Sequence, residues 1–107
     1  MSGAAGRFVA LVSSPLLIGH VRNPGGTGGR RVHAGLDAEG SFAVAVQDGR
    51  GLGAPRAYGS ALAAAQGFNA ELDRARRDGL ASSPEPAALS EAALLAARDA
   101  TPDRLGG

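Results

Sequence analysis

Apolar and polar residues alternate along the first half of the chain in four short runs. Each run is rich in Val, Leu or Phe, and a polar or glycine-containing segment separates it from the next. Such alternation places the apolar side chains on one face of a strand. The pattern predicts four strands, at residues 8–12, 16–22, 30–36 and 41–47.

The second half of the chain has a helical pattern. After a Gly- and Pro-rich connection at 48–59, apolar residues recur at spacings of three and four. Ser60 is suited to cap a helix and Gly79 to end one, so we predict a helix over 60–78. A weaker helical pattern predicts a second helix over 84–99.

These elements predict a single α+β domain over residues 1–107, a length that suits one hydrophobic core. A four-stranded antiparallel meander sheet occupies 7–47, and the first helix covers one of its faces (ββββα). The short second C-terminal helix follows. Residues 1–6 and 101–107 are expected to be flexible ends.

The register of the second hairpin can be predicted, because a slip of one residue moves every side chain to the other face. Placing Arg22 opposite Arg31 also places His20 opposite His33 and keeps the apolar residues together on one side. In this scheme Leu17 lies opposite Leu36. The first strand is expected to fold back on the second through the turn at 13–15.

The third hairpin is predicted to close through a three-residue loop, Ala38 to Gly40, with glycine in the left-handed conformation. This loop pairs Leu36 with Phe42 and Val32 with Val46. A two-residue loop would mix apolar and basic side chains on one face, which argues against it.

This register leaves one sheet face uncovered by the helix. Its side chains include no acid; they are Phe8, Ile18, His20, Arg22, Arg31, His33, Ala43, Ala45 and Gln47. Basic side chains beside an aromatic ring are typical of surfaces that bind single-stranded nucleic acid. The candidate anion-binding or nucleic-acid-binding residues are therefore His20, Arg22, Arg30, Arg31, His33 and Phe8.

The sequence NPGGTGGRR at 23–31 resembles a phosphate-binding loop only in its glycine content. A P-loop requires a lysine, and the chain has none. A dinucleotide fingerprint lies between a strand and a helix, whereas predicted strands flank this segment. We interpret residues 23–29 as a hairpin tip and Arg30 and Arg31 as its basic shoulder.

Metal and catalytic sites find less support. His20 and His33 could offer two ligands, but zinc requires a third and usually a fourth, so we predict neither a metal nor another cofactor. The serines at 13, 14, 41 and 60 fall where turns or helix caps favour serine, and no catalytic triad is identifiable. Asp37, Glu39 and Asp48 are expected to gather at one end of the sheet. A small enzyme of unassigned reaction remains an alternative.

Composition narrows the class of protein further. There is no cysteine, which excludes disulfides and thiolate sites, and no apolar run approaches the roughly 20 residues that span a membrane. We therefore expect a cytoplasmic protein.

Alanine accounts for 23 residues, against 22 Val, Leu, Ile and Phe. Because alanine contributes little burial energy, we expect self-association as a homodimer.

Two resemblances concern the arrangement of elements. Four strands followed by a helix resemble one unit of the Whirly and Pur-alpha families, which implies single-strand binding through the sheet and dimerisation. The stretch DAEGSFAVAVQDGRG at 37–51, followed by AYGSALAAAQGFNAEL at 57–72, is similar in rhythm to HicB-type antitoxins.

The sequence thus predicts a small, self-associating binding module. Its open Arg/His face is expected to contact an anionic partner, either single-stranded nucleic acid or an acidic protein segment. The alternative is an assembly adaptor or antitoxin-like accessory protein that uses the same face or the second helix.

Overall fold

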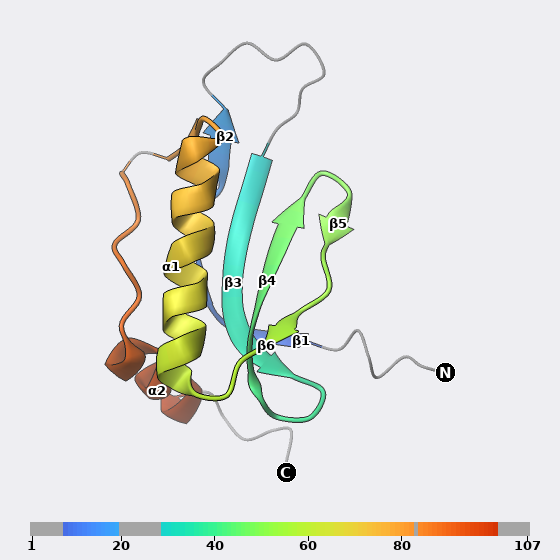
Figure 1. Ribbon diagram of the computed structural model, residues 1–107, viewed down its shortest axis with the longest axis vertical. Helices are drawn as coiled ribbons and strands as arrows, with labels where there is room; N and C mark the ends of the chain where they lie inside the picture. Colours follow the sequence, from blue (N-terminus) through green and yellow to red (C-terminus); the bar gives the residue numbers. More distant parts are fainter. Residues whose placement is uncertain (1–7, 20–28, 83, 101–107) are drawn as a thin grey trace.

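The computed structural model describes residues 8–19, 29–82 and 84–100, and it has an α+β fold with an antiparallel sheet (Figure 1). Two helices pack on this sheet, α1 (Ala61–Arg77) and α2 (Glu91–Ala100). The strands are β1 (Phe8–Ser13), β2 (Leu17–Gly19), β3 (Gly29–Asp37), β4 (Phe42–Asp48), β5 (Gly51–Leu52), β6 (Arg56–Ala57) and β7 (Leu80–Ala81).

The hairpin of β3 and β4 has the predicted register. Leu36 lies opposite Phe42, and Val32 lies opposite Val46. Gly40 has a φ of +83° in the connecting turn, the left-handed conformation that glycine adopts without strain. The N–H of Gly40 donates to the carbonyl of Asp37 at 3.0 Å, which closes the turn.

The predicted pairing of the first two strands is wrong, because β1 pairs with β3 and not with β2. β2 pairs with the other end of β3, so the two short strands follow one another along the same edge. The register along β1 shifts between Ala10 and Val12, which identifies a β-bulge. The simple meander of four strands is therefore not the observed topology.

Ser14 explains why the chain continues along β3 where a hairpin turn was expected. Its backbone N–H donates to the carbonyl of Val32 at 2.8 Å, and its hydroxyl oxygen accepts the N–H of Val32 at 3.0 Å. The hydroxyl also donates to the carbonyl of Pro15 at 2.8 Å. These bonds bridge the interruption between β1 and β2, and Ser14 is buried.

The predicted register of the second hairpin is also wrong. Leu17 lies opposite Arg30, not opposite Leu36. His33 lies opposite Ser13 on one side and Ala45 on the other, so the expected pairing of His33 with His20 does not occur. His20 and Arg22 themselves lie outside the described residues.

The core lies between α1 and one face of the sheet, as predicted. Ser60 caps α1, since its hydroxyl accepts the N–H of Ala63 at 3.1 Å, and Gly79 follows the last turn with a φ of +87°. The helix buries a stripe at three- and four-residue spacing against the strands. The buried cluster consists of Leu17, Val32, Ala34, Val44, Ala61, Ala64, Phe68, Leu72, Ala75 and Leu94. Val9, expected in this layer, is 37% exposed.

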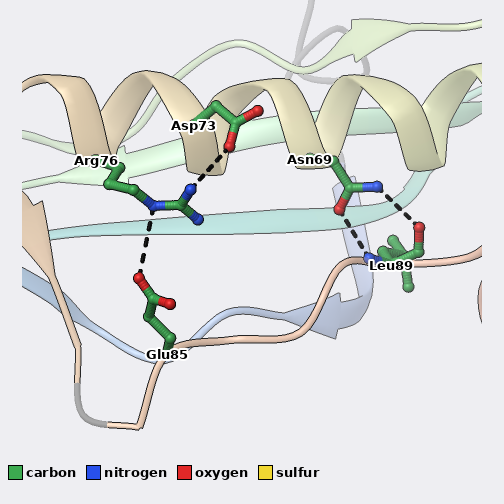
Figure 2. A network of polar contacts seen from close by, with 5 residues as sticks. All are labelled: Asn69, Asp73, Arg76, Glu85 and Leu89. Carbon is green, nitrogen blue, oxygen red and sulfur yellow. Dashed lines mark hydrogen bonds and ion pairs between the residues drawn. The ribbon is translucent and has the colours of Figure 1, made fainter.

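The C-terminal segment differs from the prediction at its start. Residues 85–90 are not helical but run along α1, and the second helix begins at Glu91 rather than near residue 84. Figure 2 shows the reason: the side-chain amide of Asn69 donates to the carbonyl of Leu89 at 2.9 Å and accepts its N–H at 2.7 Å. Arg76 adds a weaker contact to Glu85 at 3.7 Å.

The connection predicted at 48–59 also contains two short strands, β5 and β6. β5 and β6 pair with opposite ends of β4 and extend the sheet on that side. The N–H of Gly53 donates to the carbonyl of Val46 at 2.8 Å between them. Short, interrupted edge strands of this kind limit pairing with a second sheet.

Candidate anion-binding face

Arg31 and His33 lie on the face of β3 that points away from α1. The intervening Val32 is fully buried in the core, and successive residues of a strand point to opposite faces. β4 contributes Gln47 to the same face, opposite Arg31 in the register. This part of the predicted face is present in the structure.

The other half of the predicted face is closed. In Figure 1, β1 crosses behind β3, on the side away from α1. A Cβ added to Gly35 would lie 1.9 Å from the carbonyl oxygen of Val9, so the backbone of β1 occupies the space over Gly35. Ala43 and Ala45, which were expected to be open, are 0% and 1% exposed. Among the described residues, the accessible part of this face is therefore the end that carries Arg31 and His33, beside the exposed Ser13.

Arg31 lines a shallow depression of about 260 Å³ at this end. Its Nε is buried and has no hydrogen-bond partner among the residues that the structure describes. In the same described ranges, no carboxylate forms an ion pair with Arg31. An unpaired buried donor costs about 1–3 kcal/mol of stability. A complex in which a partner supplies an acceptor to this guanidinium would therefore be stabilised.

One acid lies beside the depression, contrary to the acid-free face predicted. Asp48 contributes to its lining together with Leu16, Gly29, Gln47 and Gly49. The carboxylate of Asp48 accepts the N–H of Arg50 at 2.8 Å within its own turn. Asp48 also lies at the end of β4 remote from Asp37, so the expected grouping of these acids is wrong.

Arg30 does not belong to this face. It neighbours Arg31 in sequence and therefore points to the opposite side, where its guanidinium lies 3.0 Å from the carboxylate of Asp78. This ion pair links β3 to the C-terminal end of α1. The candidate set from the sequence is reduced to Arg31, His33 and Phe8 within the described residues.

Phe8 lies beside His33. The contact with His20 that was expected for Phe8 falls outside the described residues. The ring centroids of Phe8 and His33 are 6.5 Å apart with an interplanar angle of 65°, an edge-to-face contact. This contact uses part of the ring that base stacking would require. Phe8 therefore supports the imidazole and is a poor platform for a nucleobase.

His33 connects two polar side chains that the sequence did not single out together. Its Nδ1 lies 2.7 Å from the hydroxyl of Ser13, and its Nε2 lies 2.9 Å from Oε1 of Gln47. Ser13 was interpreted as a turn residue, because β1 was expected to end there and fold back. Only the pairing of β1 with β3 places Ser13 opposite His33.

Three exposed apolar side chains flank Arg31. Leu16 lines the depression, Ile18 lies opposite Gly29 on β3, and Leu52 lies opposite Gln47 on β4. They are 45%, 54% and 47% exposed, respectively. The accessible end of the face is thus a positive charge bordered by aliphatic groups.

The described residues contain no group of three or more His, Cys, Asp or Glu side chains that could hold a metal ion. Among the two described helices, neither is long and apolar enough to cross a membrane. The chain matches no known protein family, no curated protein and no solved structure. The proposals below therefore depend on the geometry of this face.

Proposed function

We propose that the protein is a binding module that uses the Arg31 end of its sheet to hold an acidic segment of a partner protein. The observation that carries this proposal is the position of Arg31 in the lining of an open depression, where its guanidinium forms no ion pair and its buried Nε has no acceptor among the described residues. Arginine presents a planar fork of donors that matches a carboxylate, and it suits interfaces because it is weakly hydrated.

The surroundings of Arg31 favour a protein segment over nucleic acid. Leu16, Ile18 and Leu52 offer aliphatic contacts to a partner's apolar side chains. Single-strand binders instead combine a positively charged groove with free aromatic rings. Here Phe8 already packs against His33, and Arg30 is paired with Asp78.

The arrangement also follows the usual anatomy of an interface hot spot. Arginine is enriched among residues whose truncation costs more than about 2 kcal/mol, especially where surrounding contacts exclude water. The three aliphatic side chains supply such a border around Arg31. Peptide carboxylates on the depression would thus meet a guanidinium that forms no ion pair with any carboxylate of the described residues.

A fluorescence anisotropy titration tests the proposal. The probe is a labelled peptide that alternates Glu and Leu, and a labelled single-stranded oligonucleotide is titrated in parallel at two salt concentrations. Arg31→Ala is expected to weaken peptide binding at least about tenfold, which corresponds to about 1.4 kcal/mol. The control Arg74→Ala removes an exposed charge on α1 and should bind as the wild type does.

Two results would contradict the proposal. Equal peptide affinity for wild type and Arg31→Ala would show that Arg31 is not the contact. Tight oligonucleotide binding that weakens steeply with salt would instead favour a nucleic-acid partner. Self-association stays a separate prediction, which light scattering tests; a monomer at micromolar concentration contradicts it.

A further inference from the structure

Ser13, His33 and Gln47 form a hydrogen-bonded chain, of which only Gln47 also lines the depression beside Arg31. We propose that Ser13 is a nucleophile that cleaves carboxylic esters, with His33 as its general base and Gln47 as a positioning residue. The inference does not rest on the binding function proposed above. It rests on the geometry of three side chains from three adjacent strands.

Gln47 determines which nitrogen of His33 carries the proton. Its Oε1 can only accept a hydrogen bond, so the contact at 2.9 Å places the proton on Nε2. Nδ1 then keeps its lone pair and accepts the hydroxyl proton of Ser13 over 2.7 Å. This is the relation between nucleophile, base and orienting group that defines serine-type catalytic sites on unrelated folds.

The strands hold the three groups in place. Ser13 and His33 are directly opposite one another in the register of β1 and β3, and the Phe8 ring makes an edge-to-face contact with the imidazole. The side chain of Ser13 is exposed, so a substrate can reach its oxygen from solvent. Sites built on strands hold their geometry better than sites on loops.

The reaction requires no further reagent. The oxygen of Ser13 attacks the ester carbonyl carbon while its proton passes to Nδ1 of His33. The carbon–oxygen bond to the leaving group then breaks, and His33 returns the proton to the departing alkoxide, which leaves an acyl ester on Ser13. Water then attacks the acyl carbon while His33 takes one of its protons. The bond between that carbon and the oxygen of Ser13 breaks, and His33 returns the proton to this oxygen, which releases the acid and restores the hydroxyl.

The test uses the whole chain and p-nitrophenyl acetate. Release of p-nitrophenolate is followed by absorbance, and the acetylated residue is located by peptide mass spectrometry. We expect one acetyl group on Ser13, formed faster than on Ser41, which has no imidazole partner within the described ranges. Ser13→Ala should abolish the site-specific product, and His33→Gln should slow its formation at least about 100-fold, the usual lower range for general-base catalysis.

Gln47 variants separate catalysis from structure. Gln47→Glu keeps an acceptor for Nε2–H and adds a charge that stabilises the imidazolium, so acetylation should be as fast as in wild type or faster. Gln47→Leu removes the acceptor and should slow it about tenfold or more. Acetylation of Ser13 no faster than that of Ser41 would overturn the proposal. A wild-type rate in His33→Gln, or a loss of activity in Gln47→Glu with the fold intact by circular dichroism, would overturn the assigned roles.

Discussion

Gly35 is the glycine at which a single added methyl group should destabilise the fold most. A Cβ there would lie 1.9 Å from the carbonyl oxygen of Val9 and 2.9 Å from Cα of Ala10, and Cβ contacts under 3.0 Å essentially do not occur. Both neighbours are backbone atoms of β1, so no side-chain rotation can relieve the contact. Gly35→Ala therefore forces β1 away from β3.

The loss of stability expected for Gly35→Ala can be estimated from the displacement of β1. To reach 3.0 Å, the carbonyl must move by about 1 Å, which disturbs pairing along β1 and uncovers Ala43 and Ala45. Overpacking of a filled interior costs about 1–3 kcal/mol and more where the backbone must shift. For a domain of this size, about 2–3 kcal/mol lowers the melting temperature by roughly 10–20 °C.

Thermal denaturation followed by circular dichroism measures this effect. The matched control is Gly59→Ala, because a Cβ at Gly59 meets nothing within 4 Å and its φ is not positive. We expect the control to melt within about 2 °C of the wild type, as surface substitutions usually do. A Gly35→Ala protein with the same melting temperature as the control would refute the crossing of β1 over β3.

Three further substitutions test the packing of the remaining elements by urea denaturation. Leu94→Ala empties a fully buried site under α2 and should cost about 2–5 kcal/mol; a cost under 1 kcal/mol would mean that α2 is not docked. Asn69→Ala leaves the N–H and carbonyl of Leu89 unpaired and should cost about 1–3 kcal/mol, whereas no change would contradict the contact in Figure 2. Arg30→Ala should cost under about 1 kcal/mol, since its partner Asp78 is half exposed; a larger loss would show a structural role for that pair.

The parts of the fold that sequence predicted well depend on short-range signals. The turn at Gly40 fixes the register of β3 and β4, because the hairpin loop and the apolar pattern agree there. The cap at Ser60 and the helical spacing after it predict α1 to within a residue at each end. These features need no knowledge of distant residues.

Long-range pairing was less predictable. The alternation at 8–12 suits a partner on either side, and Ser13 to Pro15 look like a turn until the buried hydroxyl of Ser14 is seen to bridge to Val32. The bulge near Ala10 shifts the register of β1 against β3, so simple alternation does not predict the pairing of these strands. Asn69, a residue on the helix surface by pattern, likewise gives no sequence signal for its contact with Leu89.

The candidate site likewise has a part that the sequence predicted and a part that it did not. Alternation along β3 was enough to place Arg31 and His33 on one face with Gln47. The sequence could not show that Arg30 is paired with Asp78 or that β1 covers Gly35, because both depend on tertiary packing. Ser13 joined His33 only through the observed register.

The most direct test of the anion-binding proposal is a titration of ¹⁵N-labelled protein with the unlabelled Glu/Leu peptide, followed by amide chemical shifts. We expect the changes to concentrate at the amides of Arg31, Gln47 and Leu52 and to disappear in Arg31→Ala. Changes confined to α1 or α2, or none at millimolar peptide, would contradict the assignment of the Arg31 face as the binding surface.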